Sequence, residues 1–216
     1  MPIQTLNTIN TTNRLTIVFI VFILIHSCNK DDINYTLDSF ILAGQKEGPG
    51  IEYVDFDPDI HCTIVDPWEK TDTTIHLDLD RDGTDDFSLH RSMCHPSMLG
   101  ADCESVTIIP LMENEVCIDP ETSWLDTLSI RDSINTGSNW NRDEALIYSF
   151  YWVYEGETST EGYWQGVNRA NQHFIGFKIV KNDKVYFGWM GMRSDSTFRT
   201  FDFYLTDYAI LKDYPE

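Results

Sequence analysis

The chain has 216 residues, of which 35 are Asp or Glu and 15 are Lys or Arg, so its formal net charge at pH 7 is −20. This acidity argues against nucleic acid or anionic lipid as a partner, because both depend on basic surfaces. It fits a cation-binding protein or a soluble extracellular one, and bound cations are expected to stabilise so acidic a fold. The length suits one β-rich domain or two small ones.

The first 27 residues are typical of a secretory signal peptide. Arg14 precedes a largely apolar run of 11 residues, 15–25. That run is too short for a membrane-spanning helix, which needs about 20 apolar residues. The following Ile25–His26–Ser27–Cys28 resembles a bacterial lipobox, in which the chain is cut before the cysteine and the cysteine is acylated. We therefore expect a lipid-anchored protein that begins at Cys28; an ordinary signal peptide followed by a free cysteine is the alternative.

Residues 28–50 are interpreted as a tether, with one early strand over 40–43. Lys30 is followed by two aspartates, which resembles the surface-export tag of lipoproteins in some Gram-negative bacteria. This pattern predicts an outer-membrane lipoprotein that is exposed at the cell surface; a solvated linker is the alternative. The tether ends in Gly48–Pro49–Gly50, and residues 51–216 are predicted to form the folded domain.

That domain is predicted to be an antiparallel β-sandwich of jelly-roll type, because strand-like runs alternate with turn signals and no long window has helical periodicity. The run 145–155 is apolar or aromatic on both faces and predicts a central strand. Asn182–Asp183 predicts a tight hairpin between 173–181 and 184–193. Residues 119–144 are left open between helix and strand. The other predicted strands are 52–56, 62–65, 73–79, 86–92, 105–111, 115–118, 197–205 and 208–212.

Residues 75–89 carry the spacing with the most specific chemistry. Alternating aspartates, a glycine and a further aspartate form D-x-D-x-D-G-x-x-D, which resembles a calcium loop. Leu89 stands where an EF-hand has its bidentate glutamate, and strands are expected to flank the loop, so we predict a hairpin with calcium chemistry. An acidic turn without metal is the alternative. The expected ligands are Asp78, Asp80, Asp82, the backbone carbonyl of Thr84, and Asp86.

Four cysteines remain after Cys28, and in an exported chain an even set predicts two disulfides. Cys94 and Cys103 flank a loop that contains Pro96 and Gly100, which favours their pairing and leaves Cys62 with Cys117. Zinc is disfavoured because no pair has C-x-x-C spacing.

The C-terminal third carries a family resemblance. F-I-G-F-K-I-V-K-N-D-K-V-Y-F-G-W-M-G-M (174–192) and L-T-D-Y-A-I (205–210) resemble a recurring ending of secreted bacterial β-sandwich lipoproteins. Those endings run roughly Y-I-G-F-K-F, a turn, Y-Y-G-W-I-R-L and D-Y-A-Y, often with an acidic D-x-D-x-D-G-x-x-D-F segment like residues 78–87. Met190, Met192 and Ile210 depart from the pattern. The resemblance implies secretion and the sandwich fold, and it implies no reaction.

Two tryptophans, Trp140 and Trp164, lie in polar, loop-like context and are candidate ligand-binding aromatics. No H-E-x-x-H, G-x-S-x-G, P-loop or dinucleotide pattern is present, and 35 acidic residues make chance carboxylate pairs inevitable. We therefore predict a non-enzymatic, lipid-anchored surface module of unknown ligand with a structural calcium loop. A carbohydrate-binding surface protein is the alternative, and a glycan-acting hydrolase is a weaker one.

Overall fold

The computed structural model describes residues 40–62, 71–94, 102–152, 158–162, 172–182, 184–197 and 200–212. The signal peptide, Cys28 and the export tag predicted from the sequence lie outside these residues. Within the described part every regular element is a β-strand, and no helix there is long and apolar enough to cross a membrane. The strands are β1 (Ile41–Leu42), β2 (Ile51–Cys62), β3 (Thr71–Leu77), β4 (Phe87–Cys94), β5 (Asp102–Pro110), β6 (Glu115–Cys117), β7 (Ser133–Ile134), β8 (Trp140–Asn141), β9 (Ala145–Trp152), β10 (Thr158–Glu161), β11 (His173–Lys181), β12 (Lys184–Thr197) and β13 (Thr200–Leu211).

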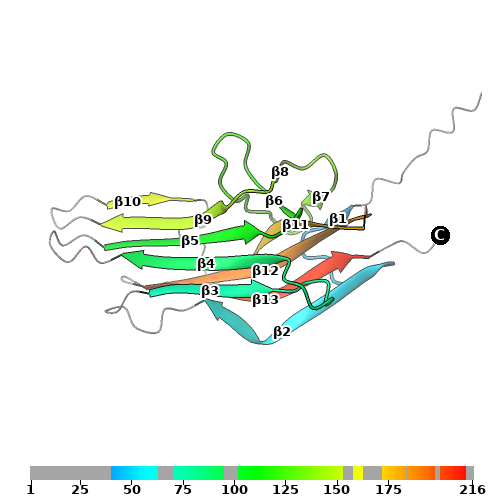
Figure 1. Ribbon diagram of the computed structural model, residues 1–216, viewed down its shortest axis with the longest axis horizontal. Helices are drawn as coiled ribbons and strands as arrows, with labels where there is room; N and C mark the ends of the chain where they lie inside the picture. Colours follow the sequence, from blue (N-terminus) through cyan, green and yellow to red (C-terminus); the bar gives the residue numbers. More distant parts are fainter. Residues whose placement is uncertain are drawn as a thin grey trace, which may run out of the picture. The chain divides into compact units, whose positions relative to one another are not determined.

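Two antiparallel sheets form the body of the fold, which confirms the predicted β-sandwich (Figure 1). One sheet has five strands in the order β10-β9-β5-β4-β3, and the other has six in the order β2-β13-β12-β11-β6-β8. A two-stranded ladder, β1-β7, belongs to neither sheet and packs on the outer face of the six-stranded one. In the five-stranded sheet three of the four neighbouring pairs are consecutive in the chain, whereas in the six-stranded sheet two of the five are, so hairpins supply about half of the pairing. The predicted central strand is confirmed, since β9 lies between β10 and β5.

The main core lies between the two sheets. Leu89 and Val106 from the five-stranded sheet are fully buried, as are Ile175 and Met190 from the six-stranded sheet, and all four belong to one apolar cluster. Phe87 packs edge-on against Phe177 with ring centroids 5.6 Å apart. Burial of apolar area between two half-apolar sheets is the main stabilising term in such a fold.

A buried ion pair interrupts this apolar core. Arg91 on β4 and Glu104 on β5 are 3% and 7% exposed, and Arg91 Nε donates to Glu104 Oε1 at 2.7 Å. Arg91 Nη1 donates to the backbone oxygen of Cys62 at 2.7 Å. Burial, and after it the nearby Glu104 carboxylate, raise the pKa of Tyr148 to about 12. Because both charges are buried, removal of either Arg91 or Glu104 alone is expected to destabilise the fold.

A second core covers part of the outer face of the six-stranded sheet. Residues 40–50, which we call the strap, bring Ile41 and Ala43 against Trp189, and all three are at most 1% exposed. Trp189 Nε1 donates to the backbone oxygen of Gln45 at 3.0 Å, and Lys46 Nζ lies 2.7 Å from Asp207 Oδ2. The predicted early strand is confirmed as β1, and part of the predicted tether thus belongs to the folded domain.

The C-terminal hairpin is confirmed, and the strand after it differs from the prediction. Lys181 pairs with Lys184, and Asn182 between them has a φ of 51°. The two strands predicted over 197–205 and 208–212 form the single strand β13. β13 pairs with β12 from Thr200 to Ile210 and with β2 from Phe203 to Leu211, and a bulge between Leu205 and Asp207 keeps both ladders running past this point. The break predicted between residues 205 and 208 therefore does not occur.

Candidate metal site

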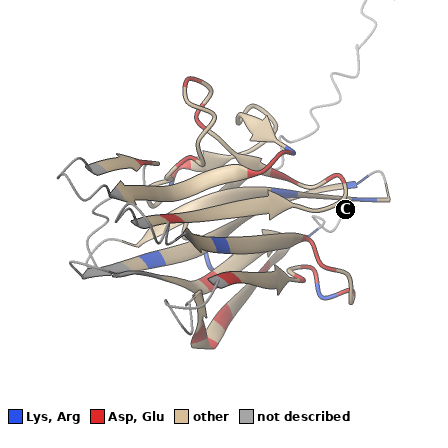
Figure 2. Cartoon of the chain, turned by 60° about the vertical axis from the view of Figure 1, so that its left-hand side comes forward, with Lys and Arg blue, Asp and Glu red and all other residues tan. Residues whose placement is uncertain are grey.

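The acidic segment forms the loop between β3 and β4, so the predicted hairpin is confirmed. Leu77 and Phe87 are the last residues to pair, and the Asp86 N–H donates to the Leu77 oxygen at 2.7 Å. Gly83 has a φ of 87°, which is the bend that its position in the motif predicts. Acidic residues gather on this loop and along β2 (Figure 2). The loop therefore concentrates negative charge at one end of the sandwich.

Three of its aspartates turn their carboxylates toward one another. Asp78, Asp80 and Asp86 each offer one oxygen, and these oxygens all lie within 4.8 Å of one another. Asp86 is only 7% exposed, and the other two are partly buried. Carboxylate oxygens in such a group are the ligands that hard divalent cations prefer. The group could therefore hold a metal ion.

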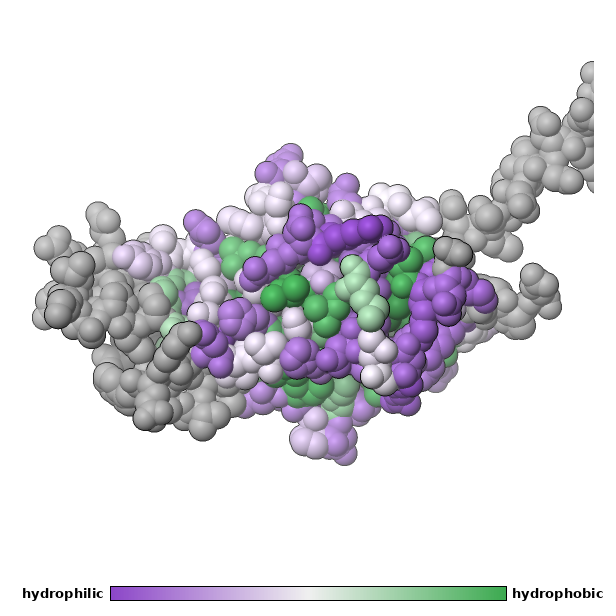
Figure 3. Space-filling model, viewed as in Figure 1, coloured by the Kyte–Doolittle hydropathy of each residue, from purple (hydrophilic) through white to green (hydrophobic). Residues whose placement is uncertain are grey.

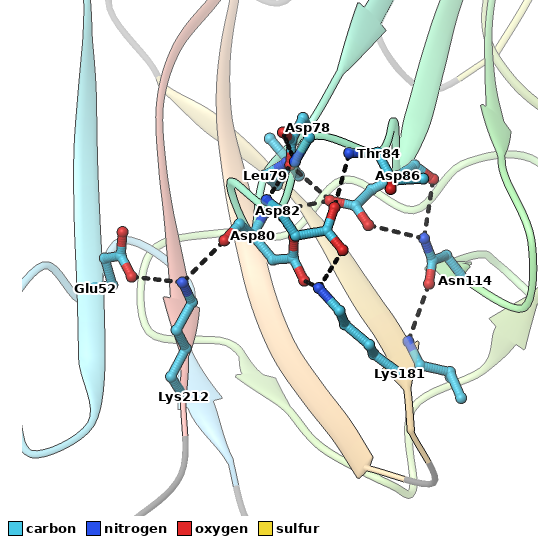
Figure 4. Close-up of polar contacts among 12 residues, drawn as sticks. Glu52, Asp78, Leu79, Asp80, Asp82, Thr84, Asp86, Asn114, Lys181 and Lys212 are labelled. Atoms are coloured by element: carbon cyan, nitrogen blue, oxygen red, sulfur yellow. Dashed lines mark hydrogen bonds and ion pairs between the residues drawn. The ribbon is translucent and has the colours of Figure 1, made fainter.

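Backbone amides fix the loop around these carboxylates (Figure 4). Asp78 accepts from the N–H groups of Asp82 at 3.1 Å and Gly83 at 2.8 Å. Asp86 Oδ2 accepts from the N–H groups of Leu79 at 2.8 Å and Asp80 at 3.2 Å. Each carboxylate thus closes a short turn of the chain, which holds the oxygens in place before any ligand binds.

Asp86 is also tied to distant strands through Asn114, which sequence reasoning missed. Asn114 is 2% exposed, and its Nδ2 donates to Asp86 Oδ1 at 3.2 Å and to the Asp86 backbone oxygen at 3.1 Å. Asn114 Oδ1 accepts from the Val180 N–H at 2.9 Å. Burial raises the pKa of Asp86, and the hydrogen bond from Leu79 opposes that rise. No spacing links residues 86, 114 and 180, so only the fold brings them together.

Two lysines bring positive charge to the loop (Figure 4). Lys181 Nζ lies 2.7 Å from Asp80 Oδ2 and also contacts Asp82 Oδ2. The hydrogen bond to Asp80, and after it the one to Asp82, raise the pKa of Lys181, while the bond from Lys181 lowers the pKa of Asp82. Lys212 Nζ donates to the Asp80 backbone oxygen at 3.1 Å and pairs with Glu52 at 2.7 Å. These ammonium groups offset part of the repulsion within the loop.

The remaining predicted ligands lie beside the group of three. Asp82 is turned toward Lys181, and its Oδ1 accepts from the exposed Thr84 N–H at 2.7 Å. Asp85 is not part of the group of three, and its Oδ2 lies 3.2 Å from His76 Nδ1. Asp82 and Thr84 as ligands therefore stay predictions that would require Asp82 to exchange its lysine for the ion.

The prediction of a Cys62–Cys117 disulfide is wrong. Both residues are free, buried thiols. Cys62 belongs to the core between the sheets, whereas Cys117 belongs to the second core on the outer face of the six-stranded sheet. A sheet separates the two sulfurs, so they cannot bond. Burial raises the pKa of both thiols, that of Cys117 to about 12.

Cys94 and Cys103 lie directly opposite each other in the β4–β5 register, and Cys103 is disulfide-bonded. The side chain of Cys94 lies outside the described residues, so its pairing with Cys103 stays a prediction that the register favours.

Trp140 contributes to the second core. Its ring stacks on Phe187 with centroids 5.6 Å apart, Lys178 Nζ lies 5.1 Å from its centroid, and its Nε1 donates to the Asn135 oxygen at 3.1 Å. These contacts occupy Trp140 within the protein. Trp164 lies outside the described residues.

Fold and loop together define a β-sandwich with an acidic, strand-flanked hairpin loop that could hold a cation. Comparisons with family models, with curated proteins and with solved structures found no match for the chain. The resemblance to secreted bacterial lipoproteins therefore stays a prediction from the sequence.

Proposed function

We propose that this protein is a lipid-anchored, non-enzymatic cell-surface module whose β3–β4 loop binds calcium as a structural ion. The observation that carries the metal site is the convergence of Asp78, Asp80 and Asp86 within 4.8 Å on a loop whose turns are already closed. The anchor and the surface location rest on the leader, Cys28 and the Lys30 tag of the sequence.

Calcium suits this loop better than magnesium. Calcium accepts six to eight oxygen ligands in flexible geometry, whereas magnesium requires a near-ideal octahedron. The loop offers three carboxylates on unequal supports, one buried and two partly exposed, together with backbone oxygens. Such a site has a Kd on the order of 10⁻⁴–10⁻³ M in extracellular modules.

The ammonium group of Lys181 competes with the ion for the same carboxylates. It bonds to Asp80 and Asp82, both in the predicted ligand set, so calcium binding has to displace it from at least one of them. This cost places the expected affinity at the weak end of the range. Calcium binding in turn reduces the electrostatic repulsion within a chain that has a net charge of −20.

Thermal unfolding of the full-length protein in detergent, with calcium and with chelator, tests the metal site. At a calcium concentration about tenfold above Kd, mass action adds about 1.4 kcal/mol to the free energy of unfolding, or roughly 3–6 °C in Tm. Asp78→Asn is expected to abolish the shift, because asparagine removes a ligand charge. It keeps one of the two oxygens that accept from the loop amides of Asp82 and Gly83. Asp85→Asn, in the same loop and outside the group of three, is the matched control.

Sodium chloride at equal ionic strength separates specific binding from general screening of the acidic surface. Equal shifts with sodium and calcium, or a calcium shift that survives Asp78→Asn, would refute the site. The anchor is tested separately by metabolic labelling with an alkyne fatty acid: the label is expected on the protein and is expected to be lost with Cys28→Ser.

A further inference from the structure

The outward face of three central strands of the five-stranded sheet has an unusual composition. On β4, β5 and β9 the residues that alternate with it, such as Leu89, Val106 and Tyr148, are buried between the sheets. Among the described side chains of this outward face there is no Asp, Glu, Lys or Arg. We call it the hydroxyl face, and its residues are Ser88, His90, Ser92, Cys103, Ser105, Thr107, Ile109, Leu146, Ser149 and Tyr151.

This uncharged face stands out because 23% of the chain is charged. The five-stranded sheet lies in front in Figure 1. In the same view white and green residues, with some purple ones among them, lie in the middle of the molecule, and purple residues border them above, below and on the right (Figure 3). Depletion of charge at the centre of a surface, with a hydrophilic rim, is typical of a binding surface. A net charge of −20 repels anionic partners, and the described side chains of this face include no carboxylate to pair with a cationic one, so the ligand that fits this face is neutral.

One row of side chains crosses all five strands in register. Asp72 is opposite Ser92, Ser92 is opposite Ser105, Ser105 is opposite Ser149, and Ser149 is opposite Glu161. The row therefore presents three hydroxyls between two carboxylates, and Ser92 Oγ donates to Asp72 Oδ1 at 2.9 Å. Adjacent strands are about 4.8 Å apart, a spacing close to the length of one sugar ring in an extended glycan.

An aromatic ring stands beside the row. Tyr151 is 46% exposed, lies two residues beyond Ser149 on the same side of β9, and pairs with Ser159 on β10. Exposed aromatic rings pack against the apolar faces of sugar rings, and the phenol offers a hydrogen bond at its tip. Hydroxyl rows, flanking carboxylate acceptors and one exposed ring are together the groups that recognise a polyhydroxylated chain.

We propose that the hydroxyl face binds a neutral polysaccharide that runs across the strands. The sugar hydroxyls exchange hydrogen bonds with Ser92, Ser105 and Ser149, the two flanking carboxylates accept from hydroxyls at the ends of the row, and Tyr151 packs against a ring. This site differs from the acidic loop and from the tryptophan pair that the sequence suggests. It gives the surface module a ligand class that its fold alone does not define.

Affinity electrophoresis tests this proposal with the full-length protein in detergent. The native gels contain glycogen, dextran, galactomannan, xyloglucan or mixed-linkage β-glucan, with alginate as the anionic comparison. Retardation is expected in at least one neutral gel and not in alginate. Tyr151→Ala is expected to weaken it roughly tenfold, the loss of about one good contact. Ser105→Lys places a long charged chain in the centre of the row and is expected to abolish it.

Ser129→Lys is the matched control, because Ser129 is exposed in a loop outside the sheet. It is expected to retain full retardation, and near-ultraviolet circular dichroism checks that all variants keep the native fold. Absence of retardation in every neutral gel overturns the proposal. So does retardation that survives both Tyr151→Ala and Ser105→Lys, and so does a preference for alginate.

Discussion

The ion pair between Arg91 and Glu104 offers a sharp test of how the core is held together. Both side chains are less than 10% exposed, and the arginine also serves the Cys62 carbonyl. Replacing one member of a buried pair strands a charge away from water and typically costs 3–5 kcal/mol, by the order of magnitude known for such pairs. We expect Glu104→Leu to lose about 3–5 kcal/mol of unfolding free energy, because the guanidinium loses its carboxylate.

The double variant Arg91→Leu/Glu104→Leu is expected to lose less than either single variant. It removes both charges and leaves the Cys62 carbonyl without its Arg91 donor, a cost of about 1–3 kcal/mol that two buried leucines partly offset. Urea unfolding followed by tryptophan fluorescence measures all three free energies in one cycle. Arg142→Leu is the comparison: the Arg142 side chain is 58% exposed, and its buried partner Glu115 keeps a second cation, Lys178, so a much smaller loss is expected. If the double variant loses the sum of the two single losses, the pair does not act as a unit and the reasoning fails.

Three further outcomes are expected. Gly188→Ala should cost about 1–3 kcal/mol by urea unfolding, because a Cβ there would lie 2.2 Å from Phe177 Cζ and 2.6 Å from a backbone oxygen of β13. Unchanged stability would show that the Phe177 ring and the neighbouring strand can shift without loss. Burial lowers the pKa of His173, so the unfolded chain binds a proton there more readily than the folded one, and stability should fall as pH drops below about 6.5. His173→Gln should flatten that slope between roughly pH 7.5 and 5.5, and an unaltered slope would assign it to other groups. Cys62 and Cys117 should resist alkylation in the native protein and both react after unfolding without reductant; rapid native labelling of either would contradict their burial.

Local patterns in the sequence predicted most of the longer strands, but β2 runs on to Cys62, beyond the strand predicted over 52–56, and β10 was not predicted. The strand predicted over 173–181 forms with Ile175, Phe177 and Ile179 buried, and Asn182 marked the hairpin tip correctly. These features depend on neighbours within a few residues, so the sequence contains them directly. The continuity of β13 was missed because it depends on pairing with β12 and with β2, and β2 lies far away in the chain.

The acidic loop, too, was only partly predictable from local sequence. Its bend at Gly83 follows from the motif, and so does the grouping of three of its aspartates. Asn114 and Lys181 contact the loop only because β6 pairs with β11 beside it. Likewise, the two free thiols could be separated only by knowing which face of a sheet each one occupies. Contacts of long sequence separation require the topology, and spacing alone does not encode it.

The strap also determines how the domain would respond to a pull from its N-terminal end. Tension applied upstream of Phe40 reaches β1 first, which is paired to β7 over only two residues and is reinforced by the half-exposed Lys46–Asp207 bridge. These contacts would open one after another, well before the long β12–β13 ladder is loaded. Residues 40–50, once released, would span at most about 36–40 Å, from an extended reach of ~3.3–3.6 Å per residue. The strap would thus yield first under load and leave the sandwich intact.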